Sequence, residues 1–275
     1  MAKTNKQKTI LGVKIDAYTI EEAIDRIINN TDEPHYVVKP YVEFFRSTKH
    51  QKVLNDAWMA LPDGVALQWA AYFQNTSGSL WQLIKTGSDI VFRPQKLNKV
   101  LPEKFAGTNF TWPLLEMAAK NNKTVYLVGS PLNQKITATA EHLSSQIPGL
   151  KIVGSSAGKD DSGEFSSRLE LQLVENLKLK KPDIVLIGIG FPRQEYLAQR
   201  LAKKLDKGIF IGEGGTFDYR QFGGQRRKAP KFMQKTGLEW LWRLMLEPSR
   251  WRRQLAIPKF MLRVYKSLHS RQSKI

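Results

Sequence analysis

The sequence predicts an α/β fold in which a mostly parallel, Rossmann-like sheet is flanked by helices and followed by a basic amphipathic helical appendage at the C-terminus. Short apolar stretches rich in Val and Ile alternate with longer stretches of helical periodicity, the order expected of parallel strands joined by helical crossovers. Apolar residues make up 41% of the 275 positions, enough for a large core. After Pro230 the helical spacing continues, but no strand follows.

The elements in the first part of the chain each have a local signal. Thr19 and Glu22 form a capping box ahead of a run of Ile residues, which predicts the start of a helix. In order, the predicted elements are a strand at 10–17, this helix, a strand at 35–40, a helix over 41–57, a strand at 58–64 and a helix at 65–73. Residues 75–100 fall outside the alternation, and we expect an insertion there, as an extra helix or a surface excursion.

The second part of the chain alternates regularly. The predicted elements are strands at 123–130, 151–156, 182–190 and 208–215, with helices near 133–146, 165–180 and 194–205. We therefore expect one α/β domain over 1–230 and a helical appendage over 231–275. One helix face of the appendage is predicted to carry Phe260, Met261, Val264 and Leu268, flanked by Lys259, Arg263 and Lys266.

The net charge of +18 is concentrated at the C-terminal end. Residues 220–275 hold 15 Lys and Arg residues against two Glu residues, a balance of +13, whereas residues 1–219 carry 28 basic and 23 acidic groups, a balance of +5. The appendage is therefore where a polyanion would bind, and nucleic acid, an anionic membrane surface and a phosphorylated substrate are the candidates.

Composition also limits the compartment and the chemistry. The absence of cysteine excludes disulfides, thiolate nucleophiles and Cys-ligated zinc. No apolar run reaches the length of about 18 residues that a bilayer-spanning helix needs, and the N-terminus lacks a hydrophobic signal core. We expect a cytoplasmic chain whose membrane contact is peripheral.

Candidate site residues follow four of the predicted strands. Ligands of open parallel sheets bind beyond the carboxyl ends of the strands, where helix N-termini present N–H groups. Asp63 in LPDG lies at such an end, either as a general base or as part of a Pro-Asp-Gly turn. The other strand ends carry Gly129-Ser130, GIGFPRQE (188–195) and GEGGTFDY (212–219).

The GIGFPRQE segment lacks the third glycine of a dinucleotide fingerprint, which weakens a dehydrogenase interpretation. Its glycines let a ligand approach the backbone, and Gln194 and Glu195 at a helix start can hydrogen-bond a base or a sugar hydroxyl. A tight turn alone would explain the glycines but not these polar residues. No Walker loop, HExxH, GxSxG or Asp-x-Asp pair occurs. We therefore expect no metal and no cofactor, and cationic side chains in their place at any diphosphate.

The segment LEWLWRLMLEPSRWRRQ (238–254) combines Trp, Leu and Arg at helical spacing. Such a helix suits a membrane interface, where indole rings lie at headgroup depth and guanidinium groups meet phosphate. It equally suits a helix packed on the body of the protein, since amphipathicity does not distinguish the two.

The motifs LPDG, YLVGS, GIGFPRQE, GEGGTFDY, KAP and GLEWLWRLMLEPSRWRR occur in an order that resembles the WecG/TagA/CpsF family of bacterial glycosyltransferases, over about residues 10 to 260. The resemblance implies transfer of an N-acetylhexosamine, typically N-acetylmannosamine, from a UDP-sugar to an undecaprenyl-diphosphate-linked sugar at the cytoplasmic membrane face. The products would be teichoic acids or other cell-surface polymers. It also implies inversion at the anomeric carbon without a metal.

The same resemblance implies roles for individual residues. Asp63 matches the general base, and Asp218 matches the acid of the GGxFDF segment. Gln194 and Glu195 match the GFPxQE site. Arginines of the family's appendage, which reach over the donor diphosphate, are matched by Arg243, Arg250 and Arg253. The remaining expected donor- and acceptor-binding residues are Lys39, Tyr41, Lys104, Asn109, Gly129 and Gly190.

The sequence departs from the family pattern at three places. Lys39-Pro40-Tyr41 stands where Thr-Pro-Asn is common, and Lys104 and Asn109 stand where Arg and Asp are common. Lys keeps the charge of Arg but loses its bidentate fork. The spacing from Asp63 to Lys104 is also longer than usual and holds the 75–100 insertion. These departures leave the identity of the donor and the acceptor open.

The predicted function is that of a metal-independent inverting glycosyltransferase, peripheral on the inner face of the cell membrane, with Asp63 as the base. The alternative is a basic nucleic-acid-binding protein whose Trp residues stack on bases, but it gives no role to the carboxylate at a strand end. The oligomeric state is left open.

Overall fold

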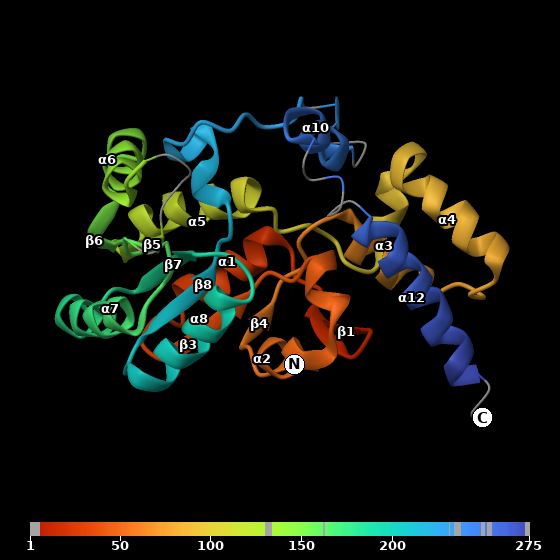
Figure 1. Ribbon diagram of the computed structural model, residues 1–275, viewed down its shortest axis with the longest axis horizontal. Coiled ribbons are helices and arrows are strands. Elements are labelled where there is room, and N and C mark those ends of the chain that lie inside the picture. Colours follow the sequence, from red (N-terminus) through yellow and green to blue (C-terminus); the bar gives the residue numbers. More distant parts are fainter. Residues whose placement is uncertain are drawn as a thin grey trace.

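The computed structural model describes residues 6–129, 134–161, 163–230, 232–233, 238–248, 251 and 255–272. At the centre lies a six-stranded, wholly parallel sheet with the strand order β4-β3-β8-β7-β5-β6. The strands are β3 Pro34–Val38, β4 Met59–Ala60, β5 Thr124–Gly129, β6 Lys151–Ser156, β7 Ile184–Gly188 and β8 Gly208–Gly212. Figure 1 shows the strands in the middle of the molecule with helices around them.

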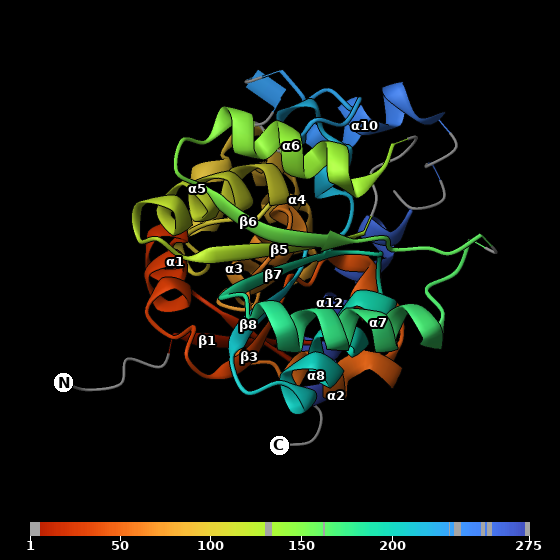
Figure 2. The same cartoon turned by 90° about the vertical axis from the view of Figure 1, so that its left-hand side faces the viewer.

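Helices cover both faces of the sheet, as Figure 2 shows. One face carries α1 Ile20–Ile28, α5 Gly107–Lys120 and α6 Ile136–Gln146, and the other carries α2 Gln51–Asn55, α3 Val65–Phe73, α7 Ser167–Lys180 and α8 Arg193–Lys204. Neighbouring strand residues point to opposite faces, so that Val125 and Leu127 enter one core while Tyr126 and Val128 enter the other. This three-layer arrangement confirms the predicted α/β fold.

The N-terminal region differs from the prediction at one place. A single strand over 10–17 is wrong, because β1 Gln7–Ile10 and β2 Val13–Asp16 form a separate antiparallel pair. Leu11 and Gly12 between them have φ of 46° and 85°, the left-handed conformations of a two-residue hairpin turn. The capping box is confirmed, since the Thr19 hydroxyl accepts from the Glu22 N–H and the Glu22 carboxylate accepts from the Thr19 N–H.

The helix predicted over 41–57 is divided into η1 Val42–Arg46, η2 Thr48–His50 and α2. Ser47 interrupts it, because its backbone is extended and its hydroxyl accepts from the Lys49 N–H. The helix α5 has no counterpart among the predicted elements, since Pro113 lies in its interior. Residues 75–100 form an extra helix, α4 Leu80–Phe92, followed by the short turn η3 Pro94–Lys99.

The α-helices with described bounds in the C-terminal region are α10 Glu239–Leu246 and α12 Ala256–Gln272. The predicted inner face of α12 is confirmed: Phe260 and Val264 are buried in the core, with Met261 and Leu268 packed partly against it. Figure 1 shows α12 running beside α3 towards the C-terminus. None of the helices within the described ranges is both long and apolar enough to cross a bilayer.

Candidate active site

A cavity of about 540 Å³ lies at the carboxyl ends of β4, β3, β8 and β7. Its wall comes mainly from the segments that follow these strands, with Lys104 and residues 106–108 on a further side. Glu239 of α10 and Ile257 of α12 border it from the C-terminal region. Segments far apart in sequence thus meet here because parallel strands end at one edge of the sheet.

Six of the predicted site residues line this cavity: Lys39, Tyr41, Asp63, Lys104, Gly190 and Gln194. The N–H of Asp63 donates to the carbonyl of Pro40 at 2.9 Å, which joins the segments after β4 and β3. Gly64, with φ of 93°, then turns the chain into α3. The Asp63 carboxylate is therefore positioned by backbone contacts at a strand end.

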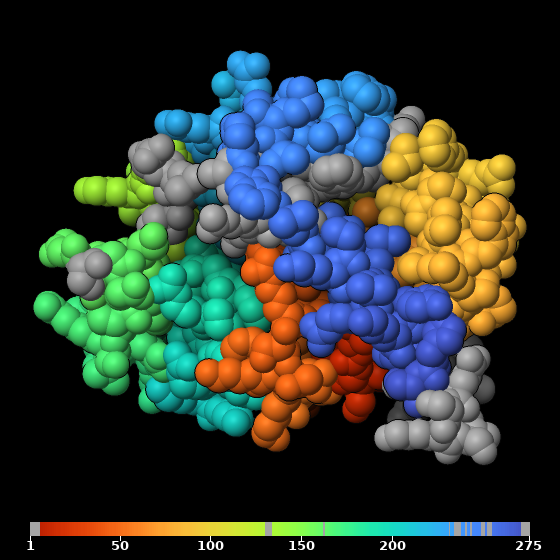
Figure 3. Space-filling model, turned by 45° about the vertical axis from the view of Figure 1, so that its right-hand side comes forward, coloured from red at the N-terminus to blue at the C-terminus, as the bar shows by residue number. Residues whose placement is uncertain are grey.

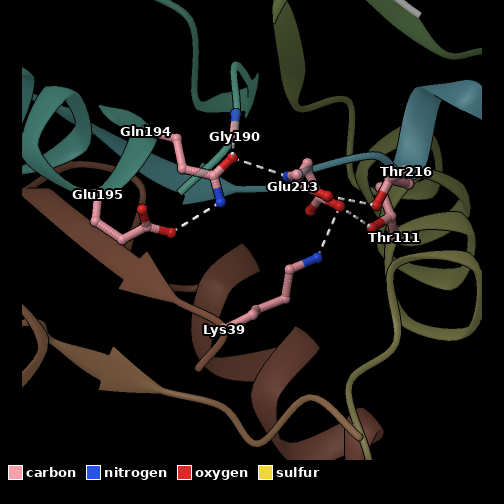
Figure 4. A network of polar contacts seen from close by, with 8 residues as sticks. Lys39, Thr111, Gly190, Gln194, Glu195, Glu213 and Thr216 are labelled. Atoms are coloured by element: carbon pink, nitrogen blue, oxygen red, sulfur yellow. Dashed lines mark hydrogen bonds and ion pairs between the residues drawn. The ribbon is translucent and has the colours of Figure 1, made fainter. Parts of the chain in front are cut away.

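The floor of the cavity is a buried ion pair, shown in Figure 4. Lys39 Nζ lies 2.7 Å from Glu213 Oε2, and the hydroxyl of Thr111 donates to the same oxygen at 2.7 Å. The two charged side chains are 5% and 0% exposed. Glu213 Oε1 is buried and has no hydrogen-bond partner among the described residues. Glu213 was not among the predicted site residues. Its position directly after the buried strand GIFIG, where ligands of parallel sheets bind, could have indicated it.

Gln194 links the turns after β7 and β8. Its Oε1 accepts from the Gly190 N–H at 3.1 Å and from the Gly214 N–H at 2.9 Å. Its Nε2 donates to Glu195 Oε1 at 2.8 Å. The Gln194 side chain thus uses both its donor and acceptor groups to fix the shape of the wall.

Glu195 lies behind Gln194 and does not line the cavity. Its side chain is fully buried, and this burial raises its pKa to about 7, although the bond from Gln194 and the charge of Lys39 act in the opposite direction. Its Oε2 has no partner among the described residues. Glu195 therefore supports Gln194 from the side away from the cavity.

Three other predicted residues lie outside the wall. Asp218 accepts from Arg226 Nη1 at 2.9 Å, and it is Arg226 that lines the cavity. The carbonyl oxygen of the Asn109 side chain lies 3.5 Å from Lys228 Nζ of the KAP segment. At Gly129 an added Cβ would lie 2.7 Å from the carbonyl oxygen of Gly188, so this glycine permits close strand packing.

The C-terminal region is tied to the cavity by two ion pairs. Lys104 Nζ lies 3.5 Å from Glu239 Oε2, and Arg226 Nη2 lies 2.9 Å from Glu247 Oε1. Arg250, Arg253 and the side chain of Arg243 lie outside the described residues. In α10, the indole nitrogen of Trp242 is buried whereas Met245 is 65% exposed, so this helix has both an inward and an outward apolar side.

The charges of the described wall are balanced. It contains the cations Lys39, Lys104, Arg193 and Arg226 and the acids Glu43, Asp63, Glu213 and Glu239. Within the described ranges, no group of three His, Asp or Glu residues is arranged to hold a metal ion. Each of these cations pairs with an acid, but the Lys39–Glu213 pair is the most deeply buried, so Lys104, Arg193 and Arg226 are the more accessible cations for a phosphorylated ligand.

Comparison with known proteins relates these motifs to a glycosyltransferase family. The sequence model of the Glycosyl transferase WecG/TagA/CpsF family matches residues 8–93 and 79–274. A relative in Bacillus subtilis strain 168 is 32% identical over 195 residues, which cover 71% of this chain and 72% of the relative. One in Bacillus spizizenii is 28% identical over 233 residues, covering 84% and 76%. A third, in Staphylococcus aureus strain NCTC 8325, is 24% identical over 263 residues, covering 94% and 92%.

All three relatives carry the name N-acetylglucosaminyldiphosphoundecaprenol N-acetyl-beta-D-mannosaminyltransferase. The matches cover both the sheet and the C-terminal helices. They give no support to the nucleic-acid-binding alternative.

Proposed function

Because the chain belongs to the WecG/TagA/CpsF family of glycosyltransferases, we propose that its cavity transfers an N-acetylhexosamine of the N-acetylmannosamine type from a UDP-sugar to polyprenyl-diphosphate-linked N-acetylglucosamine. The observation that carries the proposal is the convergence of Lys39, Asp63 and Gln194, from three separate strand ends, on one cavity. A volume of about 540 Å³ is in the range of small-molecule sites.

In the proposed reaction, Asp63 is the general base. The acceptor hydroxyl oxygen attacks the anomeric carbon of the donor, and the hydroxyl proton passes to the Asp63 carboxylate. The bond between the anomeric carbon and the β-phosphate oxygen breaks on the opposite side, so UDP leaves and the anomeric configuration inverts. Asp63 suits this role because it lines the cavity and its backbone is held by Pro40.

The leaving diphosphate needs positive charge in place of a metal ion. Lys104, Arg193 and Arg226 are the cations of the wall that meet this need, and Lys104 and Arg226 already contact acids of α10 and the residue after it. We assign Arg243, Arg250 and Arg253 to the same task, as a cationic cover contributed by the appendage.

A peripheral position on the inner membrane face fits this function. The acceptor of the related enzymes is linked to undecaprenol, so the reaction takes place at a bilayer surface. The charge balance of +13 over residues 220–275 favours binding to an anionic membrane surface. In the same region, the apolar side chains of Met245 and Leu246 are exposed on α10.

The test is a transfer assay with the purified full-length chain. A panel of UDP-sugars is incubated with a short-chain lipid-diphosphate-N-acetylglucosamine, and the lipid product is analysed by mass spectrometry and its anomeric configuration by NMR. We expect one added N-acetylhexosamine with inverted configuration. The absence of a glycosylated lipid with every donor would contradict the proposal.

A further inference from the structure

The helix α4 presents an apolar face to solvent. Its exposed fractions are 59% for Leu80, 68% for Trp81, 60% for Ile84 and 79% for Phe92. Helical spacing puts these four side chains on one side, opposite the buried residues Thr86, Asp89 and Ile90. We call this set the α4 face. Exposed apolar side chains gathered on one side of a helix are typical of interaction sites on soluble domains.

The inner side of α4 is held firmly against the body of the protein. Trp69 of α3 donates its indole N–H to the Thr86 hydroxyl at 3.0 Å, inside the core. On another side, a Cβ added at Gly87 would lie 3.3 Å from Met261 Cε, so α12 packs close to this helix. Figure 3 shows α4, in gold, beside the C-terminal helices, in blue, on one face of the molecule. The apolar face is thus a fixed surface.

Within residues 80–99, the exposed charged side chains are all basic. They are Lys85 of α4, Arg93 at the end of this helix and Lys99 of η3. Asp89 is the one acid over 80–99, and it is buried 3.9 Å from Lys96. An exposed apolar stripe whose own segment carries exposed cations has the chemistry of a helix that lies in the headgroup region of an anionic bilayer.

The position of α4 in the chain connects it to the cavity. From α4 the backbone passes through η3 to Lys104 and Thr108, which line the cavity wall. The two ranges of the family match, 8–93 and 79–274, both include this helix.

We propose that the α4 face is a membrane-docking surface in its own right, separate from the basic appendage, which enters the headgroup region of an anionic bilayer and orients the cavity towards a lipid-linked acceptor. The proposal rests on the proposed function, since only a lipid-linked acceptor requires the cavity to face a membrane. A second copy of the chain is a poorer occupant. A two-fold contact would place the α4 faces of the two copies against each other, so the cations of one copy would repel those of the other.

The test compares two double variants of the full-length chain. Trp81→Ser/Ile84→Ser removes apolar area from the α4 face. The matched control is Leu171→Ser/Leu179→Ser on α7, a different part of the molecule. Leu171 is 64% exposed and Leu179 is 78% exposed. Binding to vesicles of phosphatidylglycerol and phosphatidylcholine is measured by co-sedimentation, and lipid-free self-association by analytical ultracentrifugation.

We expect the α4 variant to bind these vesicles about tenfold more weakly or worse, and the α7 variant to bind as the wild type does. Phe92→Ser should weaken binding in the same direction. Equal vesicle binding by both double variants would overturn the proposal, as would a loss of self-association in the α4 variant with vesicle binding unchanged. Transfer to a water-soluble acceptor is measured in parallel: its absence in the wild type would contradict the proposed function, whereas unequal vesicle binding would still support the surface.

Discussion

Lys39 Nζ lies 2.7 Å from Glu213 Oε2, although 174 positions separate the two residues in the sequence. They meet because β3 and β8 are neighbours in the sheet and both charges lie just beyond the carboxyl ends of these strands. A buried pair of this kind is costly to break, since the remaining charge stays in a poorly solvated place.

Lys39→Met should therefore destabilise the protein by about 3 kcal/mol, and Glu213→Gln by a similar amount. The double variant should lose clearly less than the sum, because no unpaired charge remains. Urea unfolding of the four proteins gives the coupling energy. Strictly additive losses would show that the pair does not act as a unit.

A second prediction concerns Glu195, whose pKa rises from 4.5 to about 7 on burial. Between these pH values the folded protein holds a proton that the unfolded chain has released, so stability falls as the pH rises through this window. Glu195→Gln should remove that part of the pH dependence, on the order of 1–3 kcal/mol. The measurement is the free energy of unfolding from pH 4.5 to 8 for both proteins. An unchanged pH dependence in the variant would assign the slope to other groups.

A third prediction separates charge at the cavity from charge on the outer surface. Replacing Arg243, Arg250 and Arg253 by Ala should lower transfer to a water-soluble acceptor by roughly 10²-fold or more. The matched control is Lys259→Ala/Lys266→Ala on the exposed side of α12, which should leave this activity unchanged. Equal losses in both variants would mean that the arginines act only through the overall charge.

A fourth prediction is that transfer activity survives EDTA, because Lys104, Arg193 and Arg226 with the appendage arginines take the place of a divalent ion. Activity is measured before and after chelation, with magnesium and manganese added back. Loss on chelation and recovery with either ion would refute the metal-independent assignment.

Much of the fold follows from local patterns. The alternation of apolar strands with amphipathic helices depends on neighbouring residues, and the capping box of Thr19 and Glu22 is itself a local contact. The grouping of Lys39, Asp63 and Gln194 could also be predicted, because parallel strands end at one edge. The sequence therefore sufficed for the strands of the parallel sheet and for six residues of the cavity wall.

The rest depends on contacts that no local pattern contains. The hairpin at Leu11 requires a left-handed conformation that Leu seldom adopts. The helix α5 contains Pro113, a residue that normally indicates the end of a helix. Glu213 contacts Lys39 only because β8 and β3 are neighbours in the sheet, and local sequence patterns do not show this strand order. Likewise, the sequence of α12 does not show whether its apolar stripe packs on a membrane or on the protein. In the structure, Phe260 of this stripe packs into the main core. Removal of the whole appendage would thus also remove core packing, which is why point substitutions are the better test.

The most direct test of the proposed reaction is Asp63→Asn. The amide has nearly the same shape as the carboxylate but accepts no proton, so kcat for transfer should fall by roughly 10²–10⁴-fold. The Kd for UDP, measured by calorimetry, should stay within about twofold, because the base acts on the acceptor. Asp161→Asn, in an exposed loop, is the control. A turnover of Asp63→Asn close to that of the wild type would remove Asp63 from the mechanism and contradict the account.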